Sequence, residues 1–125
     1  MSRGDSTSQR GAASEELAAR FLQVQGLVIL GRNLRCKAGE LDLVAFDCEV
    51  LAIVEVRQRS AARFGGAPAS VTLCKQRRII RAARWFLAQR AEWRCHPLRF
   101  DVLAVEGPSD RGQRILWLRD AFRAT

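Results

Sequence analysis

The sequence predicts an α/β domain with a mixed β-sheet flanked by helices. The length of 125 residues suits a single domain. Apolar residues follow helical spacing in some segments and strand-like runs in others, and the expected element order is α-β-β-β-α-β-β. We expect residues 1–12 to be a disordered N-terminus and residues 13–125 to form the domain, because the first segment is small and polar throughout.

The first helix is expected directly after this N-terminus. Apolar residues between Leu17 and Leu22 recur on one helical face. Ser14 suits the N-cap, and Gly26 suits the C-terminal stop. Three strands, rich in Val, Leu and Ile, are expected to follow at residues 27–35, 40–46 and 50–57.

The second half of the chain repeats this alternation. Residues 60–70 contain a Phe-Gly-Gly-Ala-Pro run that indicates a flexible loop. A long helix is expected from Leu73 to Glu92, since apolar residues recur there at helical spacing. A strand is expected from Leu98 to Val105 and a short last strand from Ile115 to Leu118.

Net charge and hydropathy limit the kinds of partner that this protein can bind. The net charge of +8 favours a polyanion, and nucleic acid above all, although the predominance of Arg over Lys also fits a simple bias in genome composition. No apolar run approaches the length of a membrane span, and the N-terminus lacks the apolar core of a signal peptide. We therefore expect a cytoplasmic protein with no membrane partner and with its four cysteines reduced.

Four charged residues stand out inside apolar strands. Because side chains alternate along a strand, Glu40 and Asp42 share one face, and Glu55 and Arg57 share one face of the next strand. An even turn centred on Cys48-Glu49 would set Asp42 opposite Glu55 and Glu40 opposite Arg57. Two facing carboxylates are unfavourable without a cation, and Mg²⁺ satisfies such a pair.

The same residues also fit a purely structural ion-pair network. In that interpretation Glu40 pairs with Arg57, and Asp42 bonds to Arg59 or to the backbone. An odd turn or a bulge would break the register that the metal site requires. The residues alone leave both interpretations open.

The chain resembles the YraN family of small bacterial proteins and, through it, the PD-(D/E)xK restriction-endonuclease-like superfamily. The resemblance covers Gly11 to Phe122. Its motifs are Gly11-x-x-x-Glu15-x-Leu17-Ala18, Gly26, Asn33, Arg35, Gly39-Glu40-Leu41-Asp42-Leu43, Val54-Glu55-Val56, Arg59, Phe64-Gly65, Lys75, Arg99-Phe100-Asp101-Val102 and Asp120-Ala121-Phe122. It implies a restriction-endonuclease-like fold.

The resemblance also implies roles. Asp42 and Glu55 would be the ligands of Mg²⁺ (or Mn²⁺), with Glu40 beside them, and Glu15 would be an accessory acid, as in Holliday-junction resolvases of this fold. Where the family has Val-Lys after the glutamate, this chain has Val56-Arg57. Arg cannot act as a base, although it can stabilise charge at a phosphate.

The long helix offers a substitute for the missing lysine and a surface for nucleic acid. Lys75 falls at the edge of the core stripe, where it either reaches toward the sheet or stays exposed. Arg77, Arg81 and Arg84 lie opposite the core, and with Arg59 they are the candidate nucleic-acid contacts. Trp85 and Trp93 suit either base stacking or packing.

Three functions follow from these residues. The first is a nucleic-acid-binding protein of nuclease fold, a Mg²⁺-dependent endonuclease that acts on branched or single-stranded DNA. The second keeps DNA binding but loses catalysis because of Arg57. The third is a protein-interaction module with a basic surface. The sequence leaves the oligomeric state open, a homodimer included.

Overall fold

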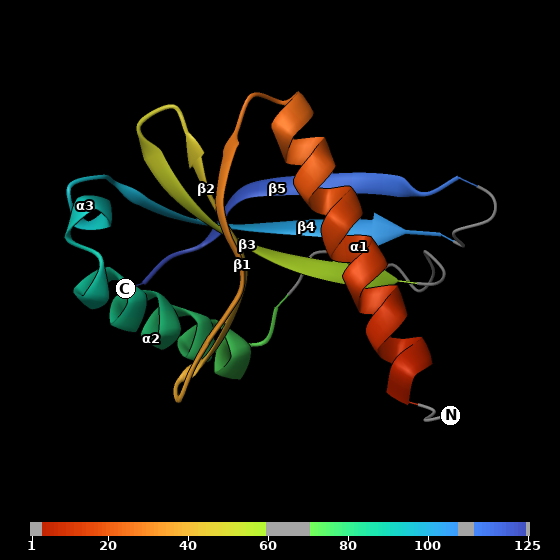
Figure 1. Ribbon diagram of the computed structural model, residues 1–125, viewed down its shortest axis with the longest axis horizontal. Coiled ribbons are helices and arrows are strands. Elements are labelled where there is room, and N and C mark those ends of the chain that lie inside the picture. Colours follow the sequence, from red (N-terminus) through yellow and green to blue (C-terminus); the bar gives the residue numbers. More distant parts are fainter. Residues whose placement is uncertain (1–3, 60–70, 108–111, 125) are drawn as a thin grey trace.

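The computed structural model describes residues 4–59, 71–107 and 112–124 and has the predicted α/β architecture (Figure 1). The 60–70 segment, where a flexible loop is expected, lies outside these residues. The elements are α1 (Gly4–Val24), β1 (Val28–Cys36), β2 (Gly39–Asp47), β3 (Val50–Arg59), α2 (Leu73–Gln89), α3 (Ala91–Arg94), β4 (Leu98–Glu106) and β5 (Arg114–Phe122).

The five strands form one mixed sheet in the order β1-β2-β3-β4-β5. Neighbouring strands are antiparallel except β3 and β4, which are parallel and are joined through α2 and α3. A parallel pair requires such a crossover, because the chain must return to the same end of the sheet. This arrangement is consistent with the restriction-endonuclease-like fold.

The sheet separates two hydrophobic clusters. Neighbouring residues Ile53 and Val54 of β3 are both buried but belong to different clusters, as alternation along a central strand requires. One cluster is completed by α1 through Ala18 and Leu22, and the other by α2 through Phe86 and its neighbours. Figure 1 shows α1 crossing the strands, with α2 well apart from it.

Two helix boundaries differ from the sequence prediction. The backbone is helical from Gly4, where disorder was expected, so Ser14 is a buried interior residue of α1 and not its N-cap. The long second helix ends at Gln89, because Arg90 adopts an extended conformation, and a separate short helix follows. The capping residues in the sequence predicted neither the start of α1 at Gly4 nor the end of α2 at Gln89.

The described part of the chain contains no helix that is both long and apolar enough to cross a membrane. All four cysteines are free, and none of them forms a disulfide with another.

Asp101 fixes the irregular end of the sheet. Its carboxylate is fully buried and accepts two hydrogen bonds from the Arg99 guanidinium at 2.8 Å each. It also accepts from the Trp117 indole at 3.1 Å and from the backbone N–H of Asp120 at 3.0 Å. Asp120 has a left-handed φ of 54°, beside a register shift between β4 and β5. A single carboxylate therefore holds this bulge, with Arg99 as its charged partner.

Asp101→Asn is expected to destabilise the fold by about 3 kcal/mol, because it removes the buried charge that holds Arg99, and because one amide oxygen cannot accept all four bonds. Chemical denaturation measures this loss. Asp47→Asn is the matched control, since Asp47 makes a single, more exposed bond to Arg99, and a loss below about 1 kcal/mol is expected for it. Equal losses in the two variants would contradict this role of Asp101.

Candidate functional site

Asp42 and Glu55 lie where β2 and β3 separate. The ladder between these strands ends at the Leu43–Val54 pair, one position before the two acids. Beyond it, the backbone N–H of Val56 donates to Asp42 Oδ2 at 2.9 Å, so a side chain takes the place of a ladder carbonyl. The Asp42 and Glu55 carboxyl groups are hydrogen-bonded to each other. The structure thus brings the two predicted metal ligands together on one side of the sheet.

The environment of Asp42 strongly disfavours its charge. Burial and the neighbouring charge of Glu55 raise the pKa of Asp42 to about 8, against the opposing effect of the Val56 N–H. At neutral pH, and without a cation, Asp42 therefore holds a proton between the two carboxyl groups. A divalent cation would take the place of that proton.

Lys75 extends from α2 to this pair. The Thr72 hydroxyl caps the helix by accepting from the backbone N–H of Lys75 at 3.2 Å, which places the lysine in the first turn. The Lys75 ammonium lies 2.7 Å from Glu55 Oε2, although the Glu55 side chain is only 4% exposed and the Lys75 side chain is 55% exposed. The lysine therefore reaches the sheet, which is one of the two outcomes that its position predicts.

These residues surround a small cavity of about 200 Å³. Glu40 lies at its rim, where it forms an ion pair of 3.3 Å with Arg35, its cross-strand partner on β1. The cavity is lined by Gly39, Glu40, Asp42, Glu55, Lys75, Arg78 and Ile79. It gathers three carboxylates and two cations from β2, β3 and α2.

A fourth acid approaches from α1. Burial raises the pKa of Glu15, as do the charges of Glu40 and Glu55, while a hydrogen bond from the Asn33 side chain lowers it. Asn33 itself lies in β1 with a left-handed φ of 52°. Glu15 therefore lies close enough to the cavity for the charges of Glu40 and Glu55 to raise its pKa.

The two carboxylates of Asp42 and Glu55 suit Mg²⁺ better than a metal whose ligands must all come from the protein. Within residues 4–59, 71–107 and 112–124, no group of three Asp, Glu, His or Cys side chains converges on one point. Mg²⁺ is commonly held by one or two carboxylates, with water and phosphate oxygens completing its octahedron. Asp42 and Glu55 match that requirement.

The predicted pairing of Glu40 with Arg57 is not part of the β2–β3 ladder. The β2–β3 ladder does not extend to these residues, and Glu40 pairs instead with Arg35. Arg57 is half-buried and makes contacts of its own, and it is absent from the described lining of the cavity.

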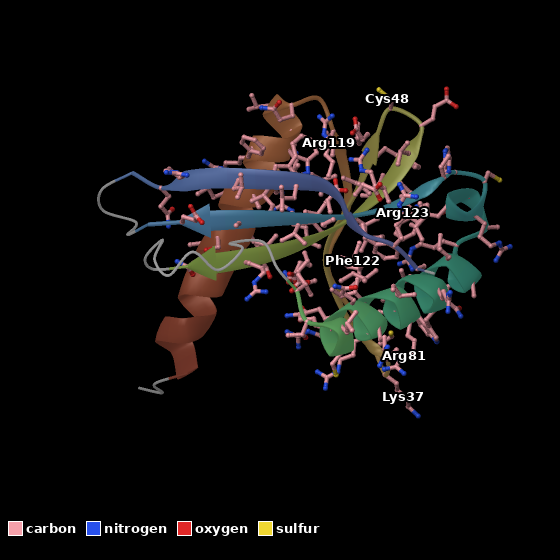
Figure 2. The ribbon with its side chains drawn as sticks, turned by 180° about the vertical axis from the view of Figure 1, so that it is seen from behind. Lys37, Cys48, Arg81, Arg119, Phe122 and Arg123 are labelled. Atoms are coloured by element: carbon pink, nitrogen blue, oxygen red, sulfur yellow. The ribbon has the colours of Figure 1, made fainter. Side chains whose placement is uncertain are left out.

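Three of the four candidate nucleic-acid contacts are on α2, the helix that carries Lys75 and Arg78. Arg77, Arg81 and Arg84 are exposed on α2. Figure 2 shows Arg81 and Lys37, from the turn between β1 and β2, extending away from the protein on the same side. The Arg59 side chain lies outside the described residues.

Sequence reasoning assigned no role to two polar residues at the site. Arg78 lines the cavity, and Asn33 bonds to Glu15. The spacing of three residues between Lys75 and Arg78 could have revealed the first, since such residues neighbour each other on a helix. The position of Asn33 depends on the register of β1, which the sequence does not specify.

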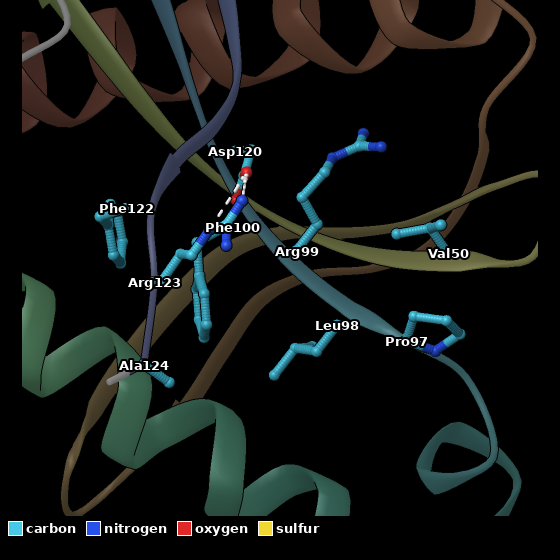
Figure 3. Close-up of a pocket in the computed structure, with 9 residues that line it drawn as sticks. All are labelled: Val50, Pro97, Leu98, Arg99, Phe100, Asp120, Phe122, Arg123 and Ala124. Atoms are coloured by element: carbon cyan, nitrogen blue, oxygen red, sulfur yellow. Dashed lines mark hydrogen bonds and ion pairs between the residues drawn. The ribbon is translucent and has the colours of Figure 1, made fainter.

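A larger cavity of about 420 Å³ lies elsewhere and contains none of the predicted site residues (Figure 3). It is largely apolar, with Phe100 and Phe122 stacked in its wall. Its charged groups are already paired, Arg123 with Asp120 and Arg99 with acids of β2 and β4. Size therefore does not identify the candidate site, whereas the converging charges do.

Asp42→Asn is expected to stabilise the metal-free protein increasingly as the pH rises. A carboxyl whose pKa is raised on folding costs nothing below its unfolded pKa of 3.8, and its penalty grows as the pH rises toward about 8. Asn mimics the protonated form and still accepts from Val56. Thermal unfolding at pH 8 with EDTA should show a rise of at least about 3 °C over wild type, the shift of ~1 kcal/mol in a domain of this size.

The same comparison at pH 4 should show almost no difference between the two proteins. Asp47→Asn on the same strand is the control for a general effect of removing charge. A variant that is less stable than wild type at pH 8 would contradict the described environment of Asp42.

Comparison with known proteins places the whole chain in one family. The family model described as "Uncharacterised protein family UPF0102" matches residues 14–105. A UPF0102 protein of Pseudomonas putida strain F1 is 48% identical over 117 residues, which is 94% of this chain and 95% of that protein. A UPF0102 protein of Ralstonia pickettii strain 12J is 51% identical over 120 residues, covering 93% of this chain and 91% of the relative. The chain therefore belongs to the UPF0102 family, which is the YraN family that its motifs resemble.

Proposed function

We propose that this protein is a Mg²⁺- or Mn²⁺-dependent endonuclease that acts on DNA with branched or single-stranded regions. The observation that carries the proposal is the buried, mutually hydrogen-bonded pair of Asp42 and Glu55, with Lys75 at 2.7 Å from Glu55. Nucleases of the PD-(D/E)xK superfamily, which the chain resembles, use two carboxylates and a lysine around one cavity for cleavage. The strongly raised pKa of Asp42 in a cavity also favours function over simple packing.

Asp42 and Glu55 would hold the cation, and Glu40 and Glu15 would stand at the rim. A bound divalent cation makes water a better nucleophile and stabilises negative charge at the phosphate. The protein supplies the fixed geometry, because Asp42 is anchored to the backbone of β3 through Val56.

Lys75 would take the place of the lysine that the family carries after the glutamate. Its ammonium now bonds to Glu55 and can turn to a water molecule or a phosphate oxygen once that carboxylate binds a cation. Arg78, at the same cavity, would hold a non-bridging phosphate oxygen. Arg57 contributes positive charge from the half-buried part of β3 without acting as a base.

A second function, a DNA-binding module without catalysis, is favoured by one observation. The ion pair of Lys75 with Glu55, together with a protonated Asp42, neutralises the cavity without a cation. The site then resembles a structural ion pair, and the basic face of α2 remains for DNA.

A cleavage panel distinguishes the two functions. Linear, flapped, looped and four-way DNA are incubated with the protein and Mg²⁺ or Mn²⁺, with EDTA as control. Metal-dependent cleavage of at least one branched or unpaired substrate supports the nuclease. DNA binding with no cleavage of any substrate by wild type or by Arg57→Lys would leave only the binding module.

DNA binding is expected to weaken steeply as salt increases, because phosphate contacts release counterions. Replacing Arg77, Arg81 and Arg84 with Ala should reduce the slope of log K against log salt by up to about three, if each arginine meets one phosphate. Fluorescence anisotropy across a salt series measures both slopes. Arg20→Ala is the control, since Arg20 is paired with Glu16 on α1. An unchanged slope in the triple variant would remove α2 from the DNA interface.

A further inference from the structure

A basic and aromatic strip runs along α2 from the candidate site. Lys75, Arg78, Arg81 and Trp85 follow one another at intervals of three, three and four residues. Residues at these intervals are neighbours on a helix surface. Lys75 and Arg78 line the cavity, so the strip begins inside the site and leads away from it. We refer to these four residues as the α2 strip.

Within the α2 strip, Lys75 is paired with Glu55, but the positive charge beyond it has no acidic neighbour on the helix. The helix contains no acidic residue between Leu73 and Gln89. Within the part of the chain that the structure describes, the guanidinium groups of Arg78 and Arg81 make no ion pair or hydrogen bond. The β1–β2 turn packs closely on α2, since a Cβ at Gly39 would lie 3.4 Å from the Arg78 carbonyl oxygen. This turn carries Lys37, which adds a further positive charge beside the helix.

Trp85 ends the strip as an exposed and oriented ring. It is 47% exposed, whereas Trp93, the other tryptophan of this region, is 6% exposed and packs in the core. The Trp85 ring lies edge-on to buried Phe86, at 4.9 Å between centroids and 84° between planes. Contact with a core residue restrains the indole while leaving much of it accessible. An indole beside unpaired guanidinium groups matches the stacking surfaces that bind single-stranded nucleic acid.

We infer that the α2 strip binds an unpaired DNA strand adjoining the scissile phosphate, with one base stacked on Trp85. This inference rests on the proposed nuclease function and specifies its substrate. Arg78 and Arg81 contact successive phosphates, and Trp85 lies about 15 Å from Lys75 along the helix, at 1.5 Å per residue. That length corresponds to about four stacked nucleotides, or fewer if the strand is extended.

The chemistry of the strip argues against other occupants. A base inside a duplex has both faces covered by its neighbours, so Trp85 can stack only on an unpaired base. A second copy of this chain would bring the same unpaired cations face to face, which is repulsive. An acidic peptide would satisfy the guanidinium groups but offers a ring only where it contains an aromatic residue, whereas every nucleotide of a single strand carries a base.

The test measures the binding of the full-length protein to an oligothymidylate of about twelve nucleotides and to a duplex of equal length, by anisotropy in EDTA. Trp85→Ala should weaken single-strand binding about tenfold or more, since one base stack contributes about 1–3 kcal/mol, and should change duplex binding less than about twofold. Trp85→Phe keeps an aromatic ring and should retain most of the single-strand affinity. Leu118→Ala, an exposed apolar residue on β5, should change neither.

Two further readouts complete the test. Oligothymidylate should quench the tryptophan fluorescence of wild type, and Trp85→Phe should lose that quenching. Polyglutamate of similar charge should bind more weakly than the oligonucleotide, and Trp85→Ala should not affect its affinity. Equal losses on single strand, duplex and polyglutamate would overturn the inference.

The inference and the proposed function fail in different ways. If wild type cleaves DNA with Mg²⁺ while Trp85→Ala binds single strands as wild type does, the role of the α2 strip is wrong and the nuclease stands. If wild type neither binds nor cleaves any DNA, the proposed function is wrong and the inference falls with it.

Discussion

Asp42→Asn is expected to lower metal-dependent DNA cleavage by at least about a hundredfold while leaving DNA affinity within about threefold of wild type. A bound cation stabilises the transition state by several kcal/mol, and each 1.36 kcal/mol changes the rate about tenfold. Asn keeps the bond from the Val56 N–H but removes the charge that holds the cation. DNA affinity should be equal or slightly higher, because one carboxylate near the phosphate is gone. Single-turnover cleavage and anisotropy measure the two quantities.

Asp47→Asn tests whether this loss is specific. Asp47 is also on β2, but its carboxylate bonds to Arg99, on the part of the sheet away from the cavity. Its replacement should leave cleavage within about threefold of wild type. Combined with the higher stability expected for metal-free Asp42→Asn, inactivity of that variant cannot be attributed to unfolding. Full activity in Asp42→Asn would remove this residue from the catalytic machinery.

The second large effect concerns which basic side chain, Lys75 or Arg57, assists the attacking water. Lys75→Ala should reduce the cleavage rate by about a hundredfold, within the range for removal of one group that stabilises developing charge. Arg57→Ala should cost less than about tenfold, because Arg57 is absent from the described lining of the cavity. Arg57→Lys should raise the rate of wild type by restoring the family's residue. Rates at saturating metal and DNA measure each change.

The double variant Lys75→Ala/Arg57→Lys distinguishes catalysis from a structural ion pair. If Lys75 has taken over the role of the family's lysine, the new lysine at position 57 should recover a substantial part of the lost rate. If Lys75 only neutralises Glu55, the double variant should be no faster than Lys75→Ala. A larger loss from Arg57→Ala than from Lys75→Ala would reverse the assignment.

Much of the fold was predictable because the signals are local. The apolar runs of β2 and β3 and the two-residue turn at Cys48-Glu49 set the register that pairs Leu43 with Val54. That register was enough to bring Asp42 and Glu55 together. The N-terminal part of α1 was not predictable, because small polar residues carry no apolar periodicity.

The rest of the site depends on long-range packing. Lys75 meets Glu55 only because α2 packs against β2 after a long connection, and Arg78 lines the cavity for the same reason. Glu40 forms its ion pair with Arg35 of β1, and the β2–β3 ladder ends before it reaches Glu40 and Arg57. A strand pattern cannot show where a ladder ends, so an arrangement based on continued pairing fails at that point.

The most direct test of the metal site is a crystal structure of the protein soaked in Mn²⁺, with the cation located by its anomalous scattering. We expect one Mn²⁺ between the Asp42 and Glu55 carboxylates, with Lys75 released from Glu55 and with no peak at this position in Asp42→Asn crystals. Absence of Mn²⁺ between these two carboxylates at millimolar concentration, with the Lys75–Glu55 ion pair intact, would contradict the account.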